Sequence, residues 1–119
     1  MAAGFANRYG GDVLIASSAG LAPIPQAPPD TIRAMNELNV DVSSHIPCRY
    51  DPIETMKYDI VINMSGFNLP GPKPKQLIEW DVTDPYGSPF EVYRSTRDDL
   101  EHRVMRLILE LRRRAKLAV

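Results

Sequence analysis

Short apolar runs that alternate with helical segments constrain the fold of this chain most strongly. Residues 59–64 (Asp-Ile-Val-Ile-Asn-Met) are the clearest strand in the sequence, and residues 77–82 (Leu-Ile-Glu-Trp-Asp-Val) predict a second strand. Residues 12–16 (Asp-Val-Leu-Ile-Ala) form a further apolar run, of the kind that is buried in a parallel sheet. Strands that alternate with helices are typical of a layered α/β fold with a mostly parallel sheet.

The helices are marked by capping residues and by apolar stripes. Residues 2–9 and residues 29–38 each predict a helix, the second because apolar side chains recur at every third position. A helix is predicted to begin at Asp51-Pro52-Ile53-Glu54. Asp51 can accept the free backbone N–H groups of the first turn, Pro52 suits the first helical position, and the Glu54 side chain can accept the backbone N–H of the capping residue. The last helix is predicted to open with a similar box at Ser88-Pro89-Phe90-Glu91. Its apolar stripe consists of Leu100, Val104, Leu107, Ile108, Leu111 and Ala115.

Length, charge and cysteine content exclude several function classes. A chain of 119 residues is large enough for one core, so we expect a single domain over residues 1–119. A net charge of −1 gives no reason to expect nucleic acid as a partner, nor an anionic membrane. No apolar run approaches the roughly 20 residues that span a bilayer. The single cysteine cannot form an internal disulfide, which indicates a reducing, cytoplasmic location.

Five stretches of the chain match a known family in order and in spacing. They are Met1-Ala2-Ala3-Gly4-Phe5-Ala6, Ser18-Ala19-Gly20-Leu21, Val40-Asp41-Val42-Ser43-Ser44-His45, Tyr58-Asp59-Ile60-Val61-Ile62, and Trp80 through Val104 with Asp84-Pro85-Tyr86-Gly87 inside it. Together they resemble the low-molecular-weight protein tyrosine phosphatases and their relatives, the thiol-dependent arsenate reductases. No single stretch is specific, but the five in family order cover nearly the whole chain.

The resemblance implies a three-layer α/β/α fold with a small, mostly parallel sheet. In that family an interior first strand leads into a phosphate loop of pattern C-x5-R, and both precede the stretch that Met1 resembles. We therefore expect the fold without this first strand, and residues 12–16 and 59–64 either separated or paired directly. Exposed strand edges or apolar surfaces then predict rearranged pairing or a homodimer. A misassigned start and a natural truncation both remain open as explanations.

The resemblance also assigns roles to five residues. The family hydrolyses phosphate monoesters through a cysteinyl-phosphate or reduces arsenate, so its ligands are phosphotyrosine or a phosphate or arsenate anion. Asp84 corresponds to the family's general acid, while Pro85 and Tyr86 correspond to the substrate entrance. Ser18 and His45 resemble the residues that hold the phosphate loop rigid. The alternative for Asp84 is a simple turn before the last helix.

The thiol inventory argues against turnover by this chain. The only cysteine is Cys48, and the residue six positions later is Glu54 rather than arginine. His45 and Cys48 could begin a zinc site, but a closed site requires four ligands, so we expect an unligated thiol and no cofactor. Reductases of one subgroup carry C-G-C ahead of N-L-P, whereas this chain has residues 64–70 as Met-Ser-Gly-Phe-Asn-Leu-Pro. We therefore expect an inactive hydrolase-type scaffold, with a pseudoenzyme that binds a partner or itself as the alternative.

Overall fold

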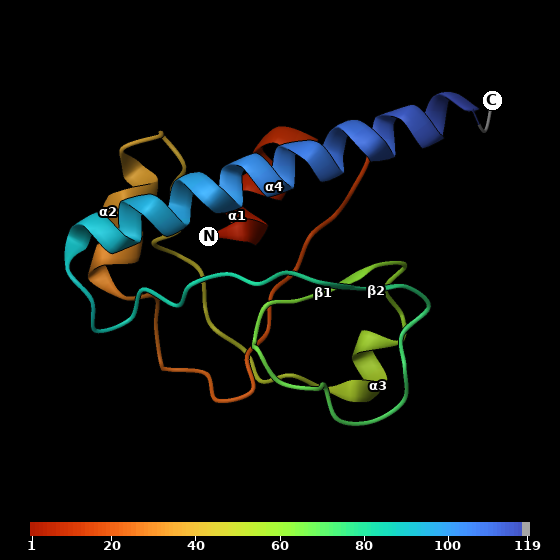
Figure 1. Cartoon of the computed structure of the whole chain (residues 1–119), viewed down its shortest axis with the longest axis horizontal. Helices are drawn as coiled ribbons and strands as arrows, with labels where there is room; N and C mark the ends of the chain where they lie inside the picture. The colour runs from red at the N-terminus through yellow and green to blue at the C-terminus, as the bar shows by residue number, and fades with distance from the viewer. Residues whose placement is uncertain (118–119) are drawn as a thin grey trace.

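The computed structural model describes residues 1–117 and confirms the α/β class. The elements follow the order α1 (Ala2–Gly10), α2 (Pro29–Asn36), α3 (Pro52–Thr55), β1 (Val61–Asn63), β2 (Leu77–Glu79) and α4 (Phe90–Leu117). Figure 1 shows α1, α2 and α4 on one side of the sheet and the short α3 on the other side. The long α4 therefore lies along the top of the molecule in this view, and loops between the elements make up much of the part below it.

The sheet contains two parallel strands, and both were predicted from the sequence. β1 and β2 pair in the register Val61↔Leu77, Ile62↔Ile78 and Asn63↔Glu79. The Val61 N–H donates to the Gln76 carbonyl at 2.9 Å, and the Trp80 N–H donates to the Asn63 carbonyl at 2.9 Å. Each strand has three residues, fewer than the predicted ranges 59–64 and 77–82, because ladder hydrogen bonds extend only over the paired stretch.

The predicted strand at residues 12–16 is wrong. The N–H groups of Val13 and Leu14 both donate to the Gly10 carbonyl at 3.0 Å, so the chain leaves α1 through a turn. Ala16 then pairs with a side chain: the Asn7 amide donates to its carbonyl and accepts its N–H, both at 2.9 Å. An apolar run becomes a strand only when a second backbone lies beside it, and within residues 1–117 the segment does not pair with β1.

The predicted helices are present, but α2 ends before its predicted boundary. α2 stops at Asn36 instead of residue 38, because Asn39 adopts a left-handed φ of 60° and the Val40 N–H returns to the Met35 carbonyl. α3 is a single turn, capped as expected by Asp51, whose Oδ1 accepts the Ile53 N–H at 2.9 Å. Glu54 does not reach back to the cap and instead pairs with Lys57 at 2.9 Å. α4 begins at Phe90, after the Ser88 N–H has bonded the Pro85 carbonyl.

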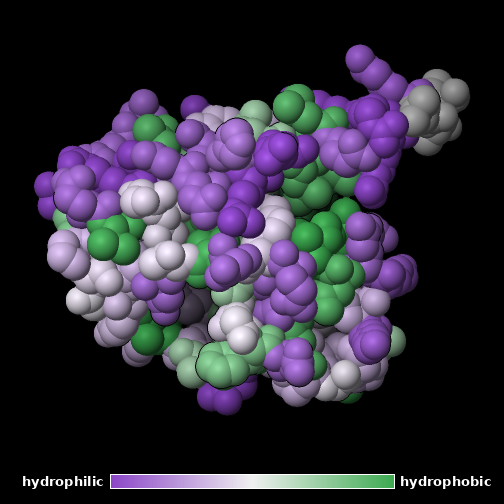
Figure 2. Space-filling view, viewed as in Figure 1, coloured by the Kyte–Doolittle hydropathy of each residue, from purple (hydrophilic) through white to green (hydrophobic). Residues whose placement is uncertain are grey.

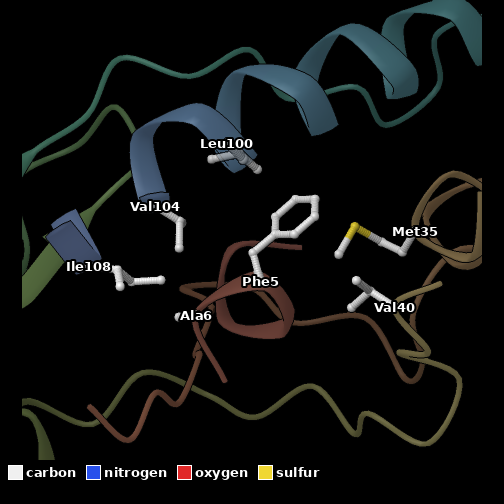
Figure 3. Close-up of a cluster of buried hydrophobic side chains, with 7 residues drawn as sticks. All are labelled: Phe5, Ala6, Met35, Val40, Leu100, Val104 and Ile108. Atoms are coloured by element: carbon white, nitrogen blue, oxygen red, sulfur yellow. The ribbon is translucent and has the colours of Figure 1, made fainter. Parts of the chain in front are cut away.

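The core lies between α1 and α4. Phe5 is fully buried and its ring stacks on Tyr9, with centroids 6.0 Å apart. Figure 3 shows the Phe5 side chain rising from α1 between Leu100 of α4 and Met35. The buried cluster consists of Phe5, Ala6, Met35, Val40, Leu100, Val104 and Ile108. Figure 2 shows hydrophobic side chains continuing beneath α4 toward the sheet, while the outer face of α4 is mostly hydrophilic. The apolar stripe of the last helix was therefore predicted correctly at its three innermost positions.

A network of ion pairs joins α2 to α4. Glu37 accepts from Arg94 at 2.6 and 3.0 Å and from Arg97 at 2.6 Å. The hydrogen bonds from Arg94, then those from Arg97, lower the pKa of Glu37 from 4.5 to about 2. A carboxyl whose pKa is lower in the folded chain stabilises the fold above its unfolded pKa, and this contribution is lost as the pH falls through the folded value.

We therefore expect the stability of the wild-type chain to fall between about pH 4.5 and 2, and Glu37→Gln to flatten this dependence. Urea unfolding at several pH values across this interval measures the effect. Glu110→Gln is the control, because Glu110 also has a pKa of about 2 but, among residues 1–117, pairs with Arg113 and Arg114 of its own helix alone. Pairs within one helix persist partly in unfolded chains, so the control should change the pH dependence less. Equal effects of the two variants would contradict the role of the interhelical contact.

Candidate functional site

The Asp84-Pro85-Tyr86-Gly87 motif forms a tight turn directly before α4. The carboxylate Oδ1 of Asp84 accepts the Tyr86 N–H at 3.0 Å, and the Ser88 N–H donates to the Pro85 carbonyl at 2.9 Å. Gly87 has a φ of 78°, which favours glycine because a Cβ would be strained there. Asp84 is exposed, and the Tyr86 side chain is 66% exposed. The three predicted residues Asp84, Pro85 and Tyr86 thus share one exposed turn, whose carboxylate is partly used to hold the turn itself.

Two residues of α4 support this turn, and neither was predicted from the sequence. The Thr96 hydroxyl donates to the Thr83 carbonyl at 3.2 Å, one residue before Asp84. Tyr93 is buried beneath the turn, and burial raises the pKa of its phenol, with smaller contributions from the negative charges of Asp30 and Asp84. A signal was present, since Tyr93 and Thr96 both lie within the Trp80–Val104 stretch that resembles the family.

A shallow cavity beside the turn is unsuited to an anion. Its volume is about 410 Å³. The residues that line it are Thr83, Glu91, Val92, Ser95, Thr96 and Asp99. Two carboxylates in the lining, from Glu91 and Asp99, would repel a phosphate or arsenate oxyanion. The charge of this lining therefore disfavours an oxyanion in the cavity.

The other two predicted residues, Ser18 and His45, lie in direct contact with each other. The Ser18 hydroxyl and the His45 Nε2 are 3.2 Å apart, although the residues are 27 positions apart in the sequence. A parallel bridge between Gly20 and Arg49 holds the two loops together: the Gly20 N–H donates to the Cys48 carbonyl at 2.9 Å, and the Tyr50 N–H donates to the Gly20 carbonyl at 2.8 Å. Both side chains are exposed.

The single thiol belongs to this second group. Cys48 is exposed, and its Sγ donates to the Ser18 carbonyl at 3.0 Å. A catalytic thiolate instead needs donors that point at the sulfur, such as backbone N–H groups at a helix N-terminus. Among residues 1–117, no hydrogen bond is formed in which Cys48 Sγ is the acceptor. The thiol is therefore placed as a donor to a carbonyl and not in an amide cradle.

The loop after β1 is held closed by side-chain hydrogen bonds. The buried Asn63 donates its Nδ2–H to the Phe67 carbonyl at 2.7 Å and accepts the Ser65 N–H and hydroxyl at 3.0 and 2.7 Å. The Phe67 N–H in turn donates to Ser65 Oγ at 3.1 Å. This loop is the stretch that carries no thiols where one reductase subgroup has C-G-C. Asn63 is a further organising residue that the sequence pattern did not reveal.

The predicted site residues thus form two groups, and within residues 1–117 no hydrogen bond or ion pair joins Asp84, Pro85 or Tyr86 to Ser18 or His45. The described part of the chain contains no group of three or more His, Cys, Asp or Glu residues that could hold a metal ion. Asp81, which lies between β2 and the turn, is exposed, and its backbone carbonyl accepts an N–H of Arg103 at 3.0 Å. No helix within residues 1–117 has the length and apolar character needed to cross a bilayer.

Comparison with known proteins identifies relatives along nearly the whole chain. A glutaredoxin arsenate reductase of Synechocystis sp. is 35% identical over 118 residues, a match that covers 93% of this chain and 87% of the relative. An arsenate reductase of Bacillus cereus is 26% identical over 110 residues and covers 89% of this chain and 81% of the relative. No protein-family model matches the chain.

Solved structures show the same relationship in three dimensions. An arsenate reductase in the phosphate binding state superimposes with a TM-score of 0.78 at 33% identity, covering 92% of this chain and 86% of the other. An arsenate reductase in the reduced state superimposes with a TM-score of 0.74, also at 33% identity and with the same coverage. Similar fold and similar sequence therefore agree over more than four-fifths of each relative.

Proposed function

The chain belongs to the arsenate reductase family that is related to the low-molecular-weight protein tyrosine phosphatases, and from this membership we propose that residues 1–119 are an oxyanion-site scaffold without turnover of their own. The observation that carries the proposal is the placement of the one thiol. Cys48 donates to the Ser18 carbonyl and has no amide cradle around it within the described residues. A thiol in this arrangement is not activated as a nucleophile.

Within this proposal, the site residues keep the roles that the family resemblance assigns to them. Asp84 is the general acid, Pro85 and Tyr86 flank the entrance, and Ser18 and His45 are the supporting pair. Two contacts support these assignments: the Ser18–His45 contact at 3.2 Å and the Asp84 turn at 3.0 Å both form in this chain. The ligand class is a tetrahedral oxyanion, phosphate or arsenate, in line with a structural neighbour that was solved in the phosphate binding state.

The loop after β1 distinguishes hydrolysis from reduction. Arsenate reduction by thiol exchange needs cysteines that can resolve the arsenic–thiol adduct. Asn63 and Ser65 form a closed hydrogen-bonded loop that has no thiol. The relatives are named as reductases and the backbone kinship is to them, but the absence of thiols from this loop favours phosphatase chemistry over the thiol-exchange route of that one reductase subgroup. We also place the protein in a reducing, cytoplasmic compartment, because its single exposed thiol is unpaired within residues 1–117.

Two activity assays on the purified chain test the proposal. Hydrolysis of para-nitrophenyl phosphate and arsenate-dependent oxidation of a glutaredoxin–glutathione system should both stay at the rate of buffer alone. Turnover of either substrate that Asp84→Ala or Cys48→Ser abolishes would overturn the proposal. Arg113→Met, which changes an exposed helix surface far along the sequence from both groups, is the control for nonspecific loss of activity.

A second candidate function is a non-catalytic module that associates with copies of itself. Exposed apolar side chains favour it, since Ile15 is 90% exposed and Ile46 is 80% exposed. Monomeric proteins expose single apolar residues routinely, so these two side chains alone do not define an interface. The edge of the sheet provides a more specific argument.

A further inference from the structure

The outer edge of β2 carries backbone groups that have no partner among the described residues. The Gln76 carbonyl and the Trp80 N–H bond to β1, so the even-numbered residues of β2 direct their backbone groups inward. Backbone groups of successive residues in a strand point to opposite sides, so Leu77 and Glu79 direct theirs outward. In the described part of the chain, β2 pairs with β1 on one side only, so its other side is an edge of the sheet, and Leu77 remains 41% exposed.

The charges along this edge change sign at Leu77, with positive side chains before it and negative side chains after it. Lys73 and Lys75 lie four and two residues before it, and Glu79 and Asp81 lie two and four residues after it. All four side chains are exposed. Lys75 makes one contact, a 4.0 Å pair with Asp59, whose side chain is 96% exposed. A pair at that distance and exposure contributes little, so Lys75 is available to another carboxylate.

We propose that β2 pairs in antiparallel orientation with β2 of a second copy of this chain, with Leu77 opposite Leu77 of the partner subunit. This register places Lys75 opposite the partner subunit's Glu79 and Lys73 opposite the partner subunit's Asp81. Two-fold symmetry repeats each ion pair, and the two sheets become one continuous sheet of four strands. The outward N–H and C=O groups of Leu77 then bond those of its counterpart, which is the hydrogen-bonded pair of an antiparallel ladder.

Other registers fit the edge less well. Pairing about Glu79 would bring two glutamates together, and like charges directly opposite each other destabilise a ladder. Pairing about Ile78 would set Leu77 against Glu79 and leave Lys73 without a carboxylate. If the two β2 strands ran parallel and in register, each lysine would lie opposite the same lysine of the other copy, and the contact would not close a two-fold dimer. Pro74 does not interfere, because the donor that it lacks belongs to the even-numbered side, which faces β1.

The strand is short, so the dimer should be weak. β2 has three residues, and residues 75–76 form a bend, so the intermolecular ladder is confined to the Leu77–Leu77 pair, and Lys75 reaches the partner subunit's Glu79 only through its side chain. Stable dimers bury at least about 1,000 Å² in total, more than so short a ladder provides. The intermolecular charge pairs add a modest attraction that selects the register and that salt screens. The dimer should therefore form at high protein concentration and dissociate when salt is added.

Sedimentation velocity over a protein concentration series, in low and in high salt, tests the proposal. The wild-type chain should shift toward dimer as concentration rises and return to monomer in high salt. Lys75→Glu and Glu79→Lys should each abolish the dimer, and the double variant should restore it because the opposite charges face each other again. Lys116→Glu, which changes the net charge by the same amount away from β2, should leave the dimer unchanged. A wild-type monomer at every concentration, or a double variant as monomeric as the single ones, overturns the proposal.

Cysteine cross-linking checks the register independently of the charges. In the Cys48→Ser background, Leu77→Cys should form a disulfide-linked dimer under mild oxidation, because hydrogen-bonded partners in an antiparallel pair have Cα atoms about 5.5 Å apart. Gln76→Cys, one position away, should cross-link far less. Equal cross-linking at both positions overturns the Leu77-centred register. The dimer does not depend on the catalytic proposal, since turnover would overturn that proposal and leave the interface intact.

Discussion

Phe5→Ala should reduce the free energy of unfolding by about 3–5 kcal/mol, the range measured for large-to-small changes at fully buried aromatic positions. The Phe5 side chain is fully buried, stacks on Tyr9, and joins α1 to α4 within the core cluster. Truncation removes the ring from contact with Met35 and Leu100 and leaves a cavity that two helices cannot close without moving apart. Domains of this size are stable by about 5–15 kcal/mol, so the variant should lose a large part of its stability.

Urea denaturation followed by far-UV circular dichroism measures this loss. Phe67→Ala provides a matched control, because the same ring is removed from a loop where it is 71% exposed. Its effect should stay within about 0.5 kcal/mol, as for other surface substitutions. If the two variants lost equal stability, Phe5 would not be the centre of the core.

Arg97→Met should reduce the free energy of unfolding by about 2–3 kcal/mol, because it leaves the buried Ala34 carbonyl without its donor and removes one ion pair from the exposed Glu37. Arg97 is 8% exposed. Its Nη1 donates to the Ala34 carbonyl at 3.0 Å and to Glu37 at 2.6 Å, across more than 60 residues of sequence in the first case. Ala34 is fully buried, so water cannot readily replace the lost donor. Methionine keeps much of the side-chain volume, which separates the hydrogen-bond effect from a packing effect.

Arg113→Met is the control for this variant. Arg113 lies on the same helix and also pairs with a glutamate, Glu110 at 2.6 Å, but its side chain is 59% exposed. Exposed ion pairs contribute little to stability, so this substitution should cause a much smaller change. Thermal unfolding of both variants beside the wild type measures the difference, and a stability loss at Arg113 as large as that at Arg97 would contradict the argument.

The parts of the candidate site that could be predicted are those encoded locally. The Asp84 turn needs a carboxylate two residues before the N–H that it accepts and a glycine at positive φ. Both residues lie within four consecutive positions of the sequence, so the turn could be predicted. The support from Tyr93 and Thr96 could not be predicted in the same way. These two helical residues contact the turn only because α4 packs over it. The sequence of the helix does not determine which loop its side chains contact.

The run at residues 12–16 and the two parallel strands show the same difference between what neighbouring residues encode and what contacts between distant segments decide. All three runs have strand-like composition, but only residues 61–63 and 77–79 lie beside another backbone. Residue Ala16 finds its hydrogen bonds in the Asn7 side chain instead. Strand propensity reports how well a residue suits a pleated surface, not whether a neighbour is present.

By itself, the order of residues determined the α/β class, the positions of the helices, the Asp51 cap and the family relationship. Each of these depends on side chains a few positions apart or on an ordered set of short motifs. Only the tertiary structure decided that Ser18 meets His45, that Glu37 joins Arg94 and Arg97, and that residues 12–16 stay unpaired. These contacts join segments 27 to 60 residues apart, and no local periodicity encodes which distant segments the packed core brings together.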